Sequence, residues 1–107
     1  MEVKMKTFKV FDFTGYNAIA IEHGETVYKA IHYHLLRNEL VQLDFTGIEI
    51  LGTAFVGVAL GRLLRDIPQE KVNGLIEFSG LSEHKRDMIQ RVMKKAYKWY
   101  FDEQNQA

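Results

Sequence analysis

The apolar positions of the chain recur with helical spacing in three segments. Over residues 23–38 they fall at three- and four-residue steps, which predicts an amphipathic helix with one buried stripe. The members of this stripe are Val27, Ala30, Ile31, His34 and Leu35. A second helix is predicted over about residues 53–67, where Pro68 ends it because the residue before a proline is pushed out of the helical region. The last helix is predicted to follow Ser82, a residue type that caps helices well.

Four other segments have the composition or the alternation of strands. Residues 7–13 and 18–21 are β-prone, and the turn residues between them predict an antiparallel hairpin. A third strand is predicted over residues 40–45 and a fourth over residues 72–79. Apolar and polar residues mostly alternate in these last two, which favours helices on one face of the sheet. The expected fold is α/β, in the order β-β-α-β-α-β-α, with a four-stranded mixed sheet and helices mainly on one face.

Composition narrows the class of protein without naming a function. The length of 107 residues suits one domain, residues 1–107. Fourteen basic and fourteen acidic residues cancel, so no global field attracts nucleic acid or an anionic membrane. The sequence has no cysteine, which excludes disulfides and thiolate metal sites. No apolar run is long enough for a membrane span and the start shows no signal-peptide core, so we expect a cytoplasmic protein without a membrane partner.

The most informative segment is residues 40–55, in which a strand leads through a loop into a new helix at Gly52 and Thr53. A hydroxyl group at this place lies near unpaired backbone N–H groups and the positive end of the helix dipole. Thr53 could therefore cap its helix, the commoner role, or carry a phosphate. Asp44, at the end of the third strand, is expected to face the open side of the sheet or to cap the following loop.

This order of elements and the strand–loop–helix segment resemble the STAS fold, which anti-sigma-factor antagonists and the cytoplasmic domains of sulfate transporters share. A closer resemblance is to the small bacterial STAS-like domain family of uncharacterised function, over roughly residues 10–92. The matching positions are Asp44, Gly47, Phe55, Gly61, Leu64 and Arg65. Ala54 stands where that family's pattern has Ser. In the comparison with anti-sigma-factor antagonists, Thr53 falls on the phosphorylated Ser and Gly52 replaces the Asp before it.

The resemblance implies a non-enzymatic, regulatory protein-binding module that Thr53 phosphorylation could switch. Its partner would be an ATPase-type anti-sigma kinase or a related signalling protein. The surface that docks this partner would comprise Gly52, Thr53, Ala54, Phe55 and Val56; the alternative for Phe55 is a wholly buried core position, the default for this residue type. An open sheet face with an exposed edge also allows a homodimer.

The alternative is a nucleic-acid-associated accessory protein that uses the basic last helix. The residues that would contact nucleic acid are Arg91, Lys94, Lys95 and Lys98. The neutral chain argues against this alternative, and a solvated helix face explains the same charges. No motif places a nucleophile beside a base, so we expect no catalytic residue. His32 and His34 lie two apart on a predicted helix and point in different directions, so no metal site and no cofactor are predicted.

Overall fold

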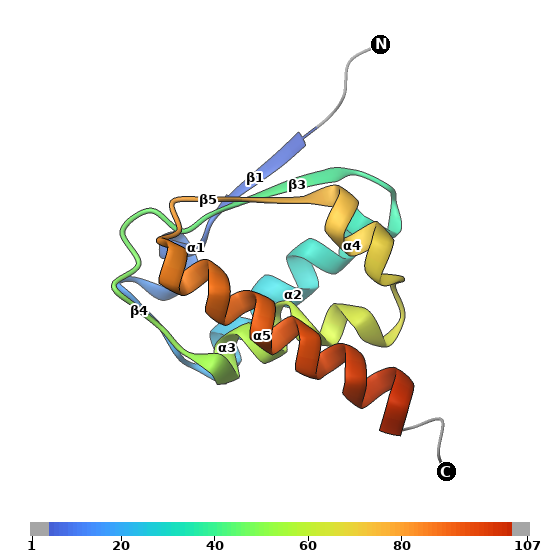
Figure 1. The fold of residues 1–107 in the computed structure, drawn as a ribbon. Helices are drawn as coiled ribbons and strands as arrows, with labels where there is room; N and C mark the ends of the chain where they lie inside the picture. Colours follow the sequence, from blue (N-terminus) through green and yellow to red (C-terminus); the bar gives the residue numbers. More distant parts are fainter. Residues whose placement is uncertain (1–4, 104–107) are drawn as a thin grey trace.

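A three-stranded parallel sheet forms one layer of the molecule (Figure 1). The computed structural model describes residues 5–103, and the side chains of residues 5–101. The strands are β1 (Met5–Lys9), β3 (Leu40–Asp44) and β5 (Ile76–Ser79), in the spatial order β1-β3-β5. All neighbours are parallel, with Met5 opposite Leu40 and Val41 opposite Ile76. The third strand, predicted over residues 40–45 from its alternation, is confirmed as the central strand β3.

A second, separate sheet has only two strands. In it β2 (Asn17–Ala18) pairs in parallel with β4 (Ile50–Leu51). We call this pair the β2–β4 ribbon. The predicted single four-stranded sheet is therefore wrong: the fold is α/β, but its strands form two small parallel sheets.

The predicted antiparallel hairpin at the start of the chain is also wrong. Its first strand ends at Lys9, and Val10–Thr14 forms the short helix α1. Gly15 has a positive φ of 71° and ends this helix. The chain therefore turns where the sequence predicts a turn, but a helix precedes the turn in place of a strand. The burial of Val10 in the core explains why a β-prone, aromatic segment turns helical, since tertiary packing overrides local preference.

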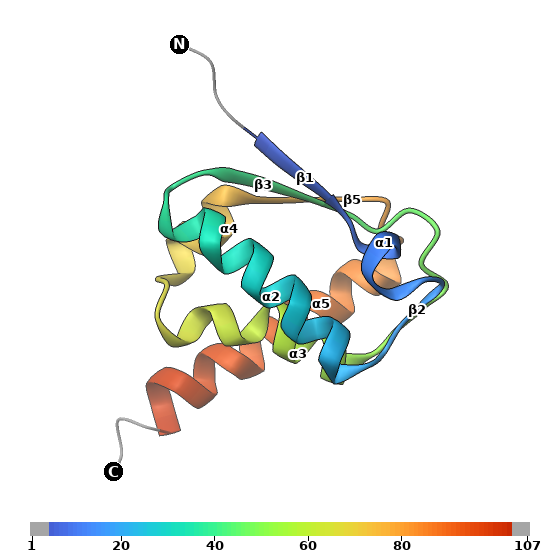
Figure 2. The same cartoon turned by 180° about the vertical axis from the view of Figure 1, so that it is seen from behind.

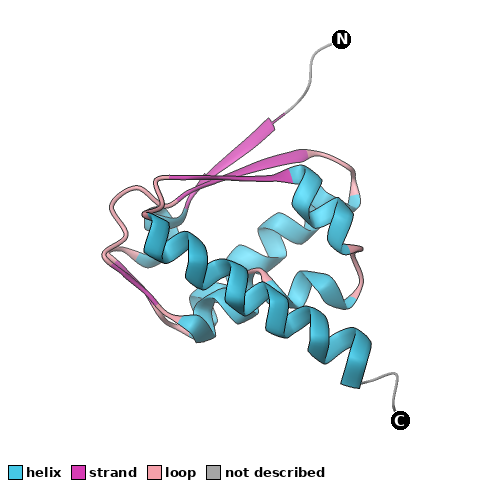
Figure 3. Cartoon of the chain, viewed as in Figure 1, coloured by secondary structure: helices cyan, strands magenta, loops and turns pink. Residues whose placement is uncertain are grey.

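All the helices lie on one side of the three-stranded sheet, as Figures 1 and 3 show. Val41 and Leu43 of β3 are buried against them, whereas Gln42 on the opposite face accepts a 3.3 Å hydrogen bond from the Thr7 hydroxyl. In the view of Figure 2, α2 lies nearest the reader and α5 farthest away, and α3 packs between them. Besides α1, the helices are α2 (Ile21–Leu36), α3 (Thr53–Ala59), α4 (Gln69–Leu75) and α5 (Glu83–Lys98), with a 3-10 helix η1 (Gly61–Arg65) and a π-helical end η2 (Trp99–Glu103).

The helix predicted over residues 53–67 is divided in two. It runs as α3 to Ala59 and continues, after a break at Leu60, as η1. Pro68 lies at the N-cap of α4, a helix that was not predicted, and β5 begins only at Ile76. The predicted fourth strand was too long because Val72, which fits a strand alternation, is instead the buried residue of α4.

Two glycines allow α3 and η1 to approach α5 closely. A β-carbon built on Gly61 would lie 3.1 Å from the Ala96 β-carbon, and one on Gly57 would lie 4.0 Å from Val92 Cγ1. The two glycines are four residues apart in the chain, and both face α5. The start of α5 agrees with the sequence, because the Ser82 hydroxyl accepts a 3.2 Å hydrogen bond from the Lys85 backbone N–H.

Candidate functional site

The loop after β4 places Thr53 on the surface as the first residue of α3. The N-cap is Gly52, with φ −92° and ψ 144°, and no side chain caps this helix. The Gly52 N–H donates a 2.8 Å hydrogen bond to the Ala18 carbonyl, which continues the β2–β4 ribbon to the helix. Thr53 is therefore not the cap, and its exposed hydroxyl does not stabilise the helix end through a hydrogen bond.

Only part of the predicted docking surface reaches solvent. Thr53 and Ala54 are exposed, and Gly52 is partly so. The side chains of Phe55 and Val56 are 1% and 0% exposed and belong to the hydrophobic core. These two residues are corrected from docking residues to core residues, because the first turn of α3 turns them towards the interior.

Two exposed isoleucines lie at the β2–β4 ribbon near the start of α3: Ile50 is the first residue of β4, and Ile19 directly follows β2. Ile19 is 47% exposed and Ile50 is 53% exposed. A β-carbon on Gly52 would lie 3.4 Å from the Ile19 Cα, so the glycine adds no side chain between Ile19 and the start of α3. Sequence reasoning missed these isoleucines because β2 and β4 have only two residues each, too few for an alternation that would show which neighbouring side chains are exposed.

The start of α3 and the basic face of α5 line one groove. From α3 come Thr53 and Ala54, and the opposite wall comes from α5. The α5 residues are Met88, Arg91, Val92, Lys94, Lys95 and Lys98. We call this feature the α3–α5 groove. Thr53 and Ala54 of the predicted docking residues therefore line the same groove as the four residues predicted to contact nucleic acid, about forty positions away in the chain.

A tight polar turn follows β3 at the carboxyl edge of the sheet. The Asp44 carboxylate accepts hydrogen bonds from the Thr46 hydroxyl at 2.6 Å and the Thr46 N–H at 2.9 Å. These bonds, the hydroxyl one first, hold the pKa of the Asp44 carboxyl below its ordinary value. Asp44 thus caps the following loop, as expected. Gly80 packs directly against this turn, because a β-carbon on it would lie 2.5 Å from the Thr46 nitrogen.

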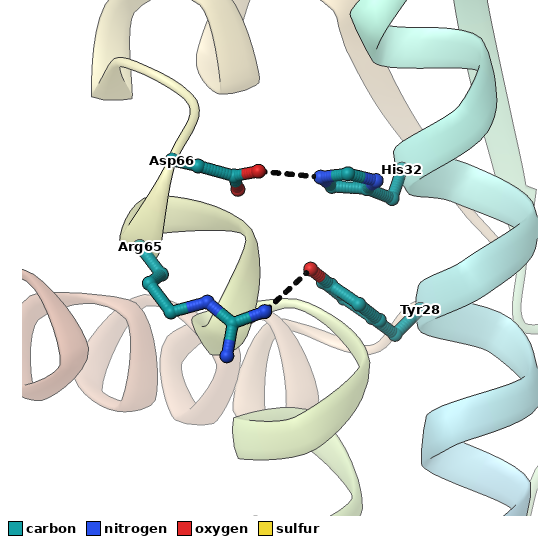
Figure 4. A network of polar contacts seen from close by, with 4 residues as sticks. All are labelled: Tyr28, His32, Arg65 and Asp66. Atoms are coloured by element: carbon teal, nitrogen blue, oxygen red, sulfur yellow. Dashed lines mark hydrogen bonds and ion pairs between the residues drawn. The ribbon is translucent and has the colours of Figure 1, made fainter.

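A second polar cluster joins α2 to the end of η1 (Figure 4). His32 Nε2 and Asp66 Oδ2 are 2.8 Å apart, and the Arg65 guanidinium donates a 3.3 Å hydrogen bond to the Tyr28 hydroxyl. The Tyr28 and His32 rings lie 5.1 Å apart on successive turns of α2. Arg62 also lies over the Tyr28 ring, 5.7 Å from its centroid. The cluster has a structural role, since it fastens the irregular η1 segment to a regular helix.

The other histidines and carboxylates of residues 5–101 do not cluster as metal ligands. In this part of the chain no group of three or more His, Asp and Glu side chains could hold a metal ion. His34 Nδ1 lies 3.0 Å from a Glu39 carboxylate oxygen, and the His34 side chain is partly buried. This agrees with its place on the apolar stripe of the helix. No helix of the described residues is long and apolar enough to cross a membrane.

The strand–loop–helix segment that carries Thr53 lies within the part of the chain that a family model matches. A family model described as "STAS-like domain of unknown function (DUF4325)" matches residues 23–86, from α2 to the first turn of α5. The chain belongs to this family. Neither the curated proteins nor the solved structures contain a match to the chain.

Proposed function

We propose that this protein is a non-enzymatic regulatory module that binds another protein through the start of α3 and the adjoining face of the β2–β4 ribbon. The observation that carries the proposal is that the exposed Thr53 and Ala54 directly follow Gly52, which packs against Ile19, and that Ile19 and Ile50 are each about half exposed. Exposed apolar side chains that adjoin one another favour a docking surface over a solvated one. The resemblance to anti-sigma-factor antagonists favours a partner of the signalling class, such as an ATPase-type anti-sigma kinase, whereas the matched family itself is described as one of unknown function.

Thr53 is the residue at which such binding would be regulated. Its hydroxyl is exposed, makes no capping bond and adjoins both the ribbon and the α3–α5 groove. A phosphate there would add about 1.5–2 negative charges and a bulky, strongly hydrated group in the middle of the docking surface. Phosphorylation is therefore expected to release a partner that contacts Ile19 and Ile50.

A non-enzymatic role is supported by the polar contacts of the described residues. Within residues 5–101 no hydrogen bond joins a hydroxyl group to a histidine, the pairing that activates a hydroxyl nucleophile. His32 and His34 each contact a carboxylate, and the contacts join parts of the fold.

The test is affinity capture of tagged protein from its native host, followed by reconstitution with the purified partner. Four proteins are compared: wild type, Thr53→Glu, Ile50→Asp and Leu36→Asp. Leu36 is a matched control, because it is an apolar residue of α2 with the same 53% exposure as Ile50. We expect one signalling protein to bind wild type and Leu36→Asp and to be lost with the other two. Binding that survives both Ile50→Asp and Thr53→Glu would refute this docking surface.

A further inference from the structure

The α3–α5 groove carries a local excess of positive charge. Four of its lining residues are cations, Arg91, Lys94, Lys95 and Lys98, and none of the described residues that line it is a carboxylate. Among the residues that the structure describes, no carboxylate forms an ion pair with any of the four. Because the whole chain has no formal net charge, this excess is confined to one surface. A cationic surface of this kind recruits a partner of opposite charge.

The cations are spaced to meet a short, regular segment. Arg91, Lys95 and Lys98 are four and three residues apart on α5, so they lie on one side of that helix. At a rise of about 1.5 Å per residue, they extend over roughly 10 Å along the helix axis. This distance corresponds to about two turns of a second helix lying alongside, with acidic residues at the same spacing.

Between the cations and α3, the groove is apolar. Ala54 of α3 lies on one side, and Met88 and Val92 of α5, both partly buried, lie on the other. Gly57, one turn along α3 from Ala54, adds no side chain there, and a β-carbon on it would still be 4.0 Å from Val92. Apolar side chains of a bound segment would be removed from water here, while carboxylates on its flank reach the lysines.

Apolar lining is what favours a protein segment over nucleic acid. Sites for single-stranded nucleic acid combine phosphate contacts with aromatic side chains on which bases stack. No described residue that lines this groove is aromatic; Trp99 and Tyr97 are not among its lining residues. An amphipathic acidic segment satisfies both the apolar and the cationic parts, whereas a phosphate backbone satisfies only the second.

We infer that the partner contributes an acidic amphipathic segment, about two helical turns long, that lies in the α3–α5 groove. This inference rests on the proposed function, which it extends by naming the chemistry of the partner. The ribbon isoleucines and the groove then form two halves of one interface, with Thr53 between them. An acidic group at Thr53 would compete with the segment's carboxylates for the cations of the groove.

The probe is a fluorescein-labelled peptide of about 15 residues with leucines at positions i, i+3, i+4 and i+7 and glutamates on the flanks of this stripe. A second peptide has glutamine at every glutamate position. Binding to the full chain is measured by fluorescence anisotropy at low and at physiological salt. We expect the glutamate peptide to bind at least about tenfold more tightly than the glutamine peptide, and the preference to shrink as salt screens the charges.

Charge reversal locates the binding. The double variant Arg91→Glu/Lys95→Glu should weaken the glutamate peptide by about tenfold or more. Lys29→Glu/Lys71→Glu changes the net charge by the same amount on α2 and α4, outside the groove, and should leave the affinity within about twofold. Circular dichroism of each variant checks that the fold is intact.

Three results would overturn the inference: no preference for the glutamate peptide, equal losses in the two double variants, or displacement of the peptide by single-stranded DNA that binds more tightly. The first two results would mean that the cations of α5 are solvent-exposed charges without a binding role. The third would mean that the groove binds nucleic acid. Failure of the proposed function is distinguishable. A partner that is lost with Ile50→Asp but retained by Arg91→Glu/Lys95→Glu would uphold the docking surface and reject the acidic segment.

Discussion

Replacing Gly80 with alanine is expected to destabilise the protein severely, although the change adds one methyl group at an exposed turn. Gly80 follows β5 and has a φ of 72°, a conformation that residues with a β-carbon seldom adopt. The new β-carbon would lie 2.5 Å from the Thr46 nitrogen and 2.6 Å from its hydroxyl oxygen. Neither distance is tolerable for non-bonded atoms, so the two turns would have to separate.

The magnitude follows from two terms. A positive φ costs a residue with a β-carbon about 1–2 kcal/mol. Separating the turns also weakens the hydrogen bonds between Thr46 and the Asp44 carboxylate, and bonds to charged groups contribute about 1.5–3 kcal/mol. The sum is about 3–5 kcal/mol, a large share of the roughly 5–15 kcal/mol that stabilises a typical domain.

Two other glycines separate these terms experimentally. Gly15 has a φ of 71° and a ψ of −154°, a combination almost restricted to glycine, but a β-carbon on it would have no neighbour within 4 Å, so Gly15→Ala should show a backbone cost without a close contact. Gly74, near the end of α4, has neither a positive φ nor a neighbour, and Gly74→Ala should be neutral or stabilise by up to about 1 kcal/mol. Urea unfolding at neutral pH, followed by circular dichroism, gives each free energy of unfolding. If Gly80→Ala cost no more than the roughly 1–2 kcal/mol expected for the positive φ, the close contact with Thr46 would not be rigid and the reasoning would fail.

Three further substitutions test the site and the turn in the same unfolding assay. Phe55→Ala should cost about 3–5 kcal/mol because it removes a buried ring, and a loss below about 1 kcal/mol would place Phe55 outside the core. Thr53→Ala should change stability by less than about 0.5 kcal/mol because Gly52 is the N-cap, whereas a loss of about 1 kcal/mol would mean that Thr53 caps the helix after all. Asp44 has a folded pKa below its ordinary 3.8, so its ionised form stabilises the fold above that pH and this stability is lost as the pH falls through the folded pKa. The difference in unfolding free energy between wild type and Asp44→Asn should therefore shrink between about pH 6 and pH 3, and a difference independent of pH would contradict this.

The sequence predicted the regular, strongly patterned parts of this fold. The apolar stripe of α2 and the alternation of β3 follow the periods that burial on one face imposes. Ser82 caps α5 by a hydrogen bond to a residue only three positions further along the chain. The same reasoning failed where the structure depends on distant contacts. The residues of β2 pair with Ile50 and Leu51, and no local pattern in residues 14–21 could reveal that partner.

Sequence reasoning located the candidate site but not its composition. Thr53 was placed at a helix start, where it lies, yet which residues after it would be exposed depended on the angle at which α3 enters the core. The meeting of Thr53 with Arg91 and Lys95 depends on the tertiary packing of α3 against α5, which glycines at positions 57 and 61 allow. Spacing along the chain carries no information about such a meeting.

Every strand pair in this fold joins distant parts of the chain, and this has a consequence for how the protein folds. Met5 pairs with Leu40 and Val41 with Ile76, a separation of 35 residues in each case. Since the described strands form no hairpin, strand pairing cannot begin with a short loop, and each pairing must first close a long one. The helices are therefore expected to form and associate before the sheet does, and the chain to fold more slowly than a helical bundle of its length.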